Sequence, residues 1–372
     1  MTAFAAFTLA VWAVAFWLLA RGLRRIPRVE RAGSVDASVT IVVAARNEEP
    51  GVERAARSLL AQRQPGLSVV AVDDRSEDGT GAILDRLAAV EPALRVVHVA
   101  ALPDGWLGKN HALHVGAAQA DTEYVIFADA DVVMDPDAVA SALSHARENG
   151  LDHLAVFPRM VARGALLNAT IGVFTVLFAL RFRPGEADDP ERGGHVGVGA
   201  FNLVRREAYE AVGGHLSIRL RPDDDLRLGR LLKESGARSA AAYGDHLLRV
   251  EWYPSVVALT RGLRKNAFAA AEYRPWLVAF LVALLLAFHV GPFLAVGVAT
   301  GPARALFAGA CAFAFAAFDR SAGRFGVPRW TALLYPAGAL VVAYAIAAAT
   351  VRALVTGGVE WRGTVYPLDR LR

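Results

Sequence analysis

Residues 124–131 read Tyr-Val-Ile-Phe-Ala-Asp-Ala-Asp, an apolar run that ends in two carboxylates separated by one alanine. A short apolar run of this kind is typical of a strand that is buried on both faces, and it predicts a strand over 124–128. Two carboxylates spaced by one small residue at a strand end can direct oxygen atoms at one hard cation. We therefore expect Asp129 and Asp131 to bind Mg²⁺ or Mn²⁺.

The sequence before this strand alternates apolar runs with helical stretches. We predict further strands over 39–44, 67–72 and 94–99, and helices over 52–62, 79–90 and 111–120. Strands that alternate with helices form βαβ units, in which helices cover both faces of a parallel sheet. The predicted fold class is therefore α/β with a mostly parallel central sheet, and ligands are expected at the carboxyl ends of its strands.

Polar residues follow the other predicted strands at the same edge of the sheet. The first strand leads into residues 44–49 (AARNEE), and the second leads into residues 73–76 (DDRS). A carboxylate after the second strand is well placed to accept hydrogen bonds from a nucleobase or a ribose hydroxyl. Helix capping by Ser76 or Asp78 remains an alternative. An alternative for Asp129 and Asp131 is an acidic loop that caps the following helix, although Asp135 is better placed to cap that helix.

Two glycine-rich segments carry further candidate site residues. Residues 105–110 (GWLGKN) lead into a helix, and their glycines permit close approach of the backbone to a ligand. Lys109 is expected to reach a phosphate, although the spacing is not that of a P-loop. Residues 193–202 (GGHVGVGAFN) are expected to line a sugar pocket or to form a lid.

Three consecutive carboxylates, Asp223, Asp224 and Asp225, precede a helical stretch that runs to about residue 235. Like charges this close raise at least one pKa, which suits a general base that works near neutral pH. Acidic residues also stabilise helix N-termini. We expect Asp225 to serve the helix, which leaves Asp223 or Asp224 for chemistry.

The N-terminal segment predicts a membrane anchor. Residues 4–20 are almost continuously apolar, and five arginines follow directly: Arg21, Arg24, Arg25, Arg28 and Arg31. A cleavable signal peptide has its positive charge before the apolar run, so we expect an uncleaved anchor whose arginines stay in the cytoplasm.

A second apolar block begins near Trp276. Residues 276–299 and 331–351 are long enough to span a bilayer, residues 305–318 are marginal, and the number of C-terminal spans stays open. Residues 165–180 are also apolar, and there we expect an interfacial or packed helix.

The composition excludes several classes of function. Of the 372 residues, 55% are hydrophobic and 20% charged, which indicates a soluble part and a lipid part. The single cysteine, Cys311, excludes a disulfide framework or a cysteine zinc site within one chain. The formal net charge is +4, and the basic residues lie near apolar segments, which favours lipid headgroups over nucleic acid as partners.

Taken together, these motifs resemble those of the family 2 glycosyltransferases of GT-A fold. The matching stretches are VTIVVAARNEE, VVAVDDRSEDGT, DGWLGKNHAL, YVIFADADVVMDPDAV, GAFNLVRREAYEAVGGH and PDDDLRLGRLLKESG. The apolar flanks, GKNHAL and the tail segment 359–366 look most like the lipid-directed branch, which includes hopene-associated and ceramide-glucosyltransferase-like enzymes. The resemblance implies an inverting, membrane-bound transferase of hexosyltransferase type. It would move one sugar from a nucleotide-sugar, with a UDP-sugar expected, to a lipid or other hydrophobic acceptor.

The resemblance also implies roles for residues of the donor site. Asp74 would contact the nucleobase. Asp129 would hold the ribose or the metal, and Asp131 would hold the metal that bridges the diphosphate. The residues expected to line the nucleotide site are Ala44, Arg46 and Glu48.

For the acceptor side, the resemblance implies that Asp223 is the general base, with Asp224 as the other candidate. The family often has Glu before the base, where this chain has Pro222. The family's Gln/Arg-x-x-Arg-Trp motif keeps its arginines here but lacks the tryptophan, so one transfer rather than processive synthesis is expected. The residues expected at the acceptor or lid are Asn202, Arg261, Arg264 and Trp361.

We expect an anchor over 1–22, a catalytic domain over 36–262, membrane helices with an interfacial segment over 263–355, and a cytoplasmic or juxtamembrane tail over 356–372. The implied location is the cell inner (plasma) membrane, with several spans and a cytoplasmic catalytic domain. Two alternatives stay open. One is a nucleotide-binding membrane scaffold without turnover, and the other is a polysaccharide-chain synthase.

Overall fold

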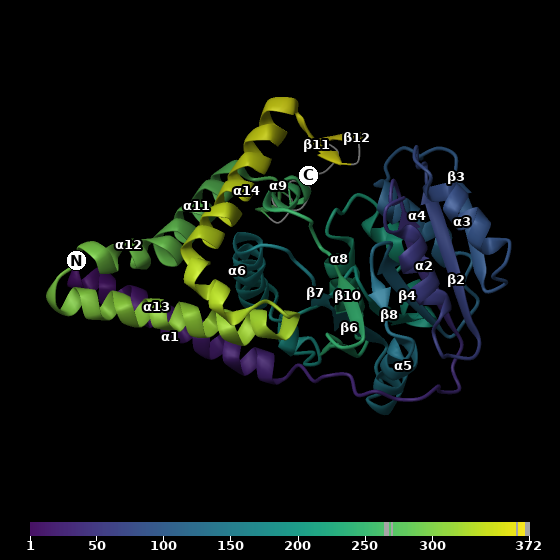
Figure 1. Ribbon diagram of the computed structural model, residues 1–372, viewed down its shortest axis with the longest axis horizontal. Coiled ribbons are helices and arrows are strands. Elements are labelled where there is room, and N and C mark those ends of the chain that lie inside the picture. The colour runs from purple at the N-terminus through teal and green to yellow at the C-terminus, as the bar shows by residue number, and fades with distance from the viewer. Residues whose placement is uncertain (264–267, 269–270, 362–363, 369–372) are drawn as a thin grey trace. The chain divides into compact units, whose positions relative to one another are not determined.

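The computed structural model describes residues 1–263, 268, 271–361 and 364–368 (Figure 1). The chain divides into two compact units. The helical unit consists of Met1–Arg25, Met160–Arg183 and Trp252–Arg372, and the α/β unit consists of Ile26–Arg159 and Pro184–Glu251. The predicted catalytic domain over 36–262 also took in Met160–Arg183, which the structure groups with the helical unit because that segment packs against apolar helices.

In the α/β unit, which is described throughout, seven strands form the main sheet in the order β3-β2-β1-β4-β8-β6-β9. Their bounds are β1 Val39–Ala45, β2 Leu67–Asp74, β3 Leu94–Val99, β4 Tyr124–Asp129, β6 His153–Phe157, β8 Asn202–Arg205 and β9 Ser239–Tyr243. All the sheet's pairings are parallel except those of β8, which runs antiparallel to both neighbours. The prediction of a mostly parallel sheet is confirmed, and the four predicted strands correspond to β1, β2, β3 and β4.

Helices connect these strands. They are α2 Val52–Leu60, α3 Thr80–Ala88, α4 Gly108–Ala117, α5 Ala138–Glu148, α7 Arg206–Ala211 and α8 Asp224–Glu234, with short 3₁₀ turns η1 Pro184–Glu186 and η2 Gly214–Ile218. A buried apolar cluster joins α4, α7 and α8 to β1, β2 and β4. Gly116 lets α4 approach the sheet closely, because a Cβ there would collide with Val42 of β1. Two short strands, β5 Val133–Met134 and β10 Leu248–Val250, pair antiparallel beside the main sheet. The remaining short strand, β7, covers Arg159–Met160.

The strand register brings the predicted polar clusters to one edge of the sheet. Ala44 of β1 lies opposite Asp129 of β4, and Ala45 of β1 lies opposite Asp73 of β2. Because β1, β2 and β4 are parallel, the loops that follow them emerge side by side.

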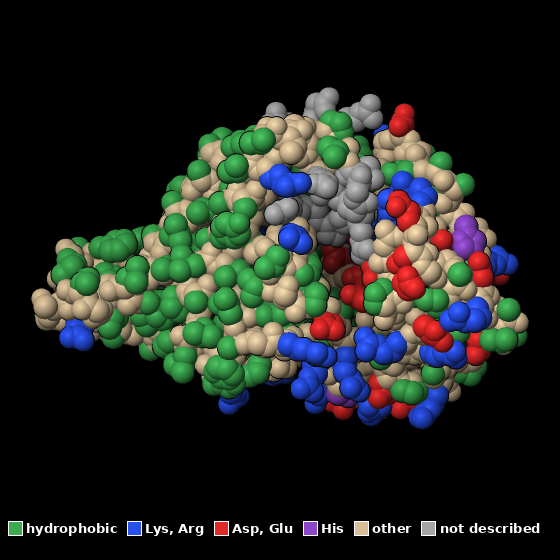
Figure 2. Space-filling model, turned by 45° about the horizontal axis from the view of Figure 1, so that its top comes forward, with side chains coloured by type: hydrophobic (Ala, Val, Ile, Leu, Met, Phe, Trp, Pro, Cys, Tyr) green, Lys and Arg blue, Asp and Glu red, His purple; other side chains and the backbone are tan. Residues whose placement is uncertain are grey.

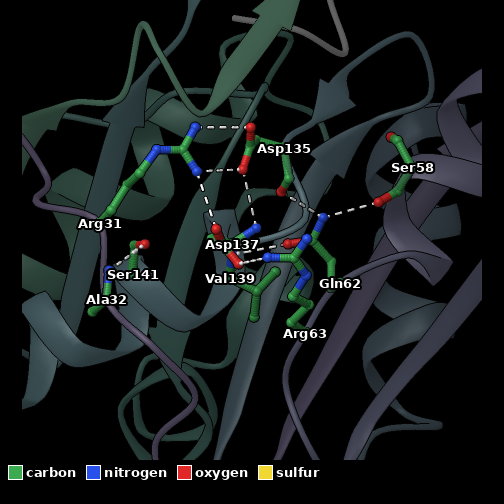
Figure 3. A network of polar contacts seen from close by, with 9 residues as sticks. All are labelled: Arg31, Ala32, Ser58, Gln62, Arg63, Asp135, Asp137, Val139 and Ser141. Carbon is green, nitrogen blue, oxygen red and sulfur yellow. Dashed lines mark hydrogen bonds and ion pairs between the residues drawn. The ribbon is translucent and has the colours of Figure 1, made fainter.

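An ion-pair network fastens residues 26–37 to the rest of the α/β unit (Figure 3). Arg31 contacts both carboxylate oxygens of Asp135, at 2.7 and 2.9 Å, and it also contacts Asp137 at 3.1 Å. Arg63 contacts the other oxygen of Asp137 at 3.1 Å. Asp135, the predicted helix cap, accepts a hydrogen bond from the Asp137 backbone, and Arg31 is the main cause of its lowered pKa.

The helical unit contains α1 Thr2–Arg24, α6 Ala165–Phe182, α9 Val256–Gly262, α11 Pro275–Leu285, the π-helical turn η4 Leu286–Val290, α12 Gly291–Val298, α13 Gly301–Ala322, η5 Gly323–Phe325, η6 Arg329–Leu334, α14 Tyr335–Thr356, β11 Gly358–Trp361 and β12 Thr364–Pro367. Within the described residues, five helices are long and apolar enough to cross a membrane: Thr2–Arg24, Ala165–Glu186, Pro275–Val298, Gly301–Phe325 and Arg329–Thr356. The segment over 305–318, predicted to be marginal, thus lies in a helix long enough to span. Figure 2 shows hydrophobic side chains over the visible face of these helices, whereas charged side chains gather on the α/β unit.

The contacts of α1 fix the directions of its neighbours. Phe4 packs against Phe307, and Phe16 packs against Phe313, so α1 and α13 run parallel. The helix Pro275–Val298 runs the other way, because Ala5 packs near Ala299 while Trp12 contacts Phe288. The C-terminal ends of α1 and α13 and the start of α11 therefore share one side of the bundle.

Candidate active site

The acidic motif at the end of β4 meets the predicted lysine and the Asp223–Asp225 segment. The Lys109 Nζ lies 2.9 Å from Oδ1 of Asp129 and 3.2 Å from Oδ2 of Asp224. Burial by itself would lower the pKa of Lys109, but Asp129, Asp224 and Asp225 more than offset this and hold its pKa well above the ordinary value. The side chain of Asp224 is 6% exposed, whereas that of Asp129 is 41% exposed and available to a ligand.

Gly199 links the same two acidic segments through its backbone. The N–H of Asp129 donates to the carbonyl oxygen of Gly199 at 2.9 Å, and the N–H of Gly199 donates to Oδ2 of Asp225 at 2.8 Å. A Cβ at residue 199 would lie 2.7 Å from Oδ2 of Asp129, and a Cβ at Gly197 would collide with the backbone of Asp225. The glycine stretch expected to form a lid is thus tightly packed against both acidic segments.

Asp131 is a buried carboxyl near two other carboxylates, whose effect on it Lys109 offsets only in part. Burial, followed by the carboxylates of Asp129 and Glu48, raises its pKa to about 7. A divalent cation would relieve this repulsion, and two or three carboxylates that leave room for phosphate oxygens fit Mg²⁺ or Mn²⁺. Among the residues that the structure describes, no group of three or more His, Cys, Asp or Glu side chains is arranged to hold a metal by itself.

The predicted base-contacting residue, Asp74, is held firmly at the end of β2. Its carboxylate is 4% exposed and accepts two hydrogen bonds from Arg75, at 2.8 and 3.1 Å. Arg46 approaches the same carboxylate at 3.9 Å. Gly108 at the start of α4 has room only for a hydrogen here, because a Cβ would collide with Asp74.

The loops after β1 and β2 are bonded to each other. The backbone N–H groups of Asn47, Glu48 and Glu49 donate to side chains at 76, 80 and 78, and residues 77 and 79 donate back to the side chains of Asn47 and Glu49. Asn47 and Arg75 both adopt a positive φ, which makes these two loops turn toward each other. These bonds join the two loops, with Arg46 near Asp74 and Glu48 near Asp131.

Asp223 and Asp224 face different partners. Asp223 accepts two hydrogen bonds from Arg221, at 3.0 and 3.1 Å, and lies 3.6 Å from Arg227. Asp224 contacts Lys109, as described above. Asp225, expected to serve the helix, bonds to its neighbour Leu226 as well as to Gly199, and burial followed by Asp224 raises its pKa to about 7.

The residues predicted at the acceptor or lid come from both units of the chain. Asn202 on β8 is 1% exposed and its Oδ1 lies 2.7 Å from Nε2 of the buried His153. Arg261 is exposed on α9, and Trp361 belongs to β11, both in the helical unit. Arg264 lies outside the described residues. The roles given to these residues stay predictions.

Sequence reasoning missed three residues that shape the site. Asn110 is fully buried and donates to the carbonyl oxygens of Ile218 and Arg221, at 2.7 and 2.9 Å, which fixes the segment before Asp223. Arg75 pairs with Asp74, and Gly199 contacts Asp129. Asn110 and Arg75 lie inside motifs that the sequence singled out, but their partners depend on the folded chain.

Comparison with known proteins agrees with this geometry. Residues 40–213 match the profile of glycosyl transferase family 2. Over 185 residues the chain is 30% identical to the 4,4'-diaponeurosporenoate glycosyltransferase of Staphylococcus aureus, both in strain bovine RF122 / ET3-1 and in strain MRSA252. That alignment covers 48% of this chain and 47% of each relative, so the chain spans about half the length of the curated relatives it matches.

A solved structure is similar over nearly the whole chain. It is the mannosyltransferase PcManGT from Pyrobaculum calidifontis in complex with GDP-Man and Mn²⁺. The TM-score is 0.55 and the identity 22%, over 95% of this chain and 98% of that chain. This likeness supports the fold, which is that of the GT-A glycosyltransferases. The chain therefore contains a glycosyl transferase family 2 domain of GT-A fold, matched over residues 40–213.

Proposed function

We propose that the protein is a membrane-bound, inverting glycosyltransferase that moves one sugar from a nucleoside-diphosphate sugar to a lipid or other hydrophobic acceptor. The observation that carries this proposal is the meeting of Asp129 and Asp224 on the ammonium of Lys109. Lys109 also acts on Asp131, and the adjacent Gly108 packs against Asp74. A family 2 domain whose acidic residues converge in this way has the groups needed to bind a diphosphate and to accept a proton from a hydroxyl.

The donor half of the site would comprise Asp74, Arg46 and Glu48 for the nucleoside and Asp129 with Asp131 for the metal. When bound, a divalent cation supplies Lewis-acid stabilisation of the leaving diphosphate. Asp74 would accept a hydrogen bond from the base, and Arg75 keeps its carboxylate in place. We propose a UDP-sugar as the first donor to test, and a GDP-sugar as the second because PcManGT was solved with GDP-Man and Mn²⁺.

Of the two candidate bases, we propose Asp224. Asp223 accepts two hydrogen bonds from Arg221 and lies 3.6 Å from Arg227, so its two oxygen atoms are directed at these arginines. Asp224 lies on the same side of the site as Asp129, because both carboxylates contact the ammonium of Lys109. In the proposed reaction, the Asp224 carboxylate takes the proton of the acceptor hydroxyl as that oxygen attacks the anomeric carbon. The bond from the anomeric carbon to the diphosphate oxygen breaks, and the nucleoside diphosphate leaves.

The charge distribution of the helical unit supports a cytoplasmic side for the ends of α1 and α13. These ends lie on one side of the bundle and carry Arg21, Arg24, Arg320 and Arg324, whereas the start of α13 carries Arg304. Arginine-rich ends remain in the cytoplasm during insertion. We therefore propose that the α/β unit is cytoplasmic, at the inner membrane, with α1, Pro275–Val298 and α13 as spans.

The acceptor is proposed to be hydrophobic for two reasons. Apolar helices would hold the domain beside the bilayer, and the named relatives of S. aureus act on 4,4'-diaponeurosporenoate. A lipid extract is therefore the first acceptor to test.

The test uses the full-length protein in lipid nanodiscs with UDP- or GDP-linked radiolabelled sugars and a lipid extract. We expect sugar transfer into the lipid fraction that depends on Mg²⁺ or Mn²⁺ and is lost in Asp131→Ala. Nucleotide binding by calorimetry without transfer from any donor would support the non-catalytic alternative instead. Full activity of Asp131→Ala would refute the metal assignment.

A further inference from the structure

Lys109 ties together three elements of the α/β unit. It lies in the first turn of α4, and its Nζ contacts Asp129 at the end of β4 and Asp224 at the start of α8. The side chain of Lys109 is 18% exposed. Its charge therefore acts in a poorly solvated environment, where ion pairs are stronger than in water.

The groups around this ammonium carry an excess of negative charge. Asp129 and Glu48 both repel the carboxylate of Asp131, and Asp224 repels that of Asp225. Lys109 supplies a positive charge that contacts both acidic segments, at 2.9 Å from Asp129 and 3.2 Å from Asp224. A cation that binds Asp129 must compete with this ammonium.

We propose that Lys109 is a built-in counter-cation that occupies Asp129 and Asp224 until the donor arrives with its divalent cation, and that it then moves to the donor diphosphate. The inference rests on the proposed function, because it assumes that Asp129 helps to bind the metal. Only ion pairs change in this step, and no covalent bond forms or breaks. The diphosphate accepts the ammonium, Asp129 is freed for the cation, and Asp224 is freed to take a proton.

Two consequences follow for binding. Without nucleotide, divalent cations bind weakly, because the cation must displace Lys109 from Asp129. With a nucleoside diphosphate present, cation and nucleotide bind cooperatively, since each favours the arrangement in which Lys109 has left the carboxylates. The order of events also keeps Asp224 from acting as a base before the donor is bound.

The test measures Mn²⁺ binding to the full-length protein in detergent by the electron paramagnetic resonance of free Mn²⁺, with and without UDP or GDP. Lys109→Met removes the charge and keeps the unbranched chain, and Lys109→Arg keeps the charge. Arg230→Met removes one positive charge from an exposed pair on α8 and controls for net charge. Without nucleotide, we expect Lys109→Met to bind Mn²⁺ about tenfold more tightly than wild type does. The factor by which UDP or GDP increases the Mn²⁺ affinity should be about tenfold smaller in this variant than in wild type.

The control variants and the nucleotide arm separate the possible failures. Lys109→Arg and Arg230→Met should retain weak binding of Mn²⁺ alone and the cooperative gain. If Lys109→Met, without nucleotide, binds Mn²⁺ no more tightly than wild type does, this inference is overturned. The proposed function would still stand in that case, provided that the wild-type protein binds Mn²⁺ when UDP or GDP is present. If wild type binds no Mn²⁺ even with UDP and GDP, both proposals fail. Lys109→Gln gives the same comparison if the methionine variant does not fold.

Discussion

The backbone N–H of Asp129 donates to the carbonyl oxygen of Gly199 at 2.9 Å, and a Cβ on residue 199 would lie 2.7 Å from Oδ2 of the same aspartate. Gly199→Ala should therefore push the Asp129 carboxylate away while the sheet stays folded. Because small displacements of reacting groups cost large factors in rate, we expect kcat/KM to fall by about tenfold to a hundredfold. Steady-state transfer kinetics and Mn²⁺ binding measure this effect.

The matched control is Gly33→Ala, because a Cβ at residue 33 meets nothing within 4 Å. This variant should keep wild-type kinetics and a wild-type melting temperature. Equal activities for the two glycine variants would show that the close contact between Gly199 and Asp129 does not matter for turnover.

The raised pKa of Asp131 predicts a pH dependence of stability. Burial, followed by Asp129 and Glu48, raises it from 3.8 to about 7, so the folded protein holds this proton more tightly than the unfolded chain. The resulting stabilisation is fully present below the unfolded pKa and is lost as the pH rises through about 7. In EDTA, the melting temperature of wild type relative to Asp131→Asn should therefore fall between about pH 4 and about pH 7 and then level off.

Adding Mn²⁺ should reverse this trend in wild type, because the cation binds the ionised carboxylate. Removing one of the repelling charges, in Glu48→Gln, should shift the fall to lower pH, since Glu48 helps to raise the pKa of Asp131. The other carboxyl with a pKa near 7, Asp225, is common to the proteins compared and cancels in the difference. A pH-independent difference between wild type and Asp131→Asn would contradict the prediction.

The network in Figure 3 predicts that Arg31 stabilises the α/β unit more than an ordinary surface arginine does. Arg31 contacts two carboxylates on a distant part of the chain, Asp135 and Asp137, whereas Arg230 makes a local pair with Glu234 on one helix. The two arginine side chains are 48% and 47% exposed, so they form a matched pair. Arg31→Met should lower the melting temperature more than Arg230→Met.

This difference should shrink as salt is added, because salt screens exposed charges, with a Debye length of about 8 Å at physiological ionic strength that shortens to about 3 Å at 1 M. Thermal unfolding at low and at high salt measures it. A difference between the variants that is independent of salt would point to lost packing of the arginine stem rather than to the ion pairs.

Much of the α/β unit was predictable because its information is local. Each apolar run and the polar residues after it predicted a strand and the loop at its carboxyl end, and the parallel register then brings Asp129 beside the loops after β1 and β2. The partner of Asp225 was not predictable in this way. Its bond to Gly199 joins residues 26 positions apart in the sequence, and no local pattern specifies it.

The assignment of α6 shows the same limit. Its residues are as apolar as a membrane span, and their position inside a domain-like sequence did not decide where they pack. The packing position of α6 is set by the contact of Gly172 with Phe318 of α13, because a Cβ at residue 172 would collide with that ring. Likewise, no local pattern predicted that the side-chain oxygen of Asn202 on β8 would lie 2.7 Å from Nε2 of the buried His153.

The last prediction concerns the contact between α1 and the helix Pro275–Val298. Phe288 lies in the π-helical turn η4, and the residue that would donate to its carbonyl in a regular α-helix is Pro292, which has no N–H. The indole Nε1 of Trp12 donates to the Phe288 oxygen at 2.8 Å instead. Trp12→Phe removes this donor, and hydrogen bonds between membrane helices average about 0.6 kcal/mol. We expect a loss of that size or more in the free energy of unfolding, measured by detergent titration.

A double-mutant cycle isolates the hydrogen bond from the change in packing. Pro292→Ala restores an N–H that can bond to the Phe288 carbonyl, so Trp12→Phe should cost less in that background, by about 0.6 kcal/mol. Trp17→Phe is the control for loss of an indole, because Trp17 is 57% exposed whereas Trp12 is 2% exposed. If Trp12→Phe costs the same with and without Pro292, the indole does not replace the missing backbone donor. If the cost falls as expected, α1 recognises a specific position on its neighbour rather than serving only as a hydrophobic anchor.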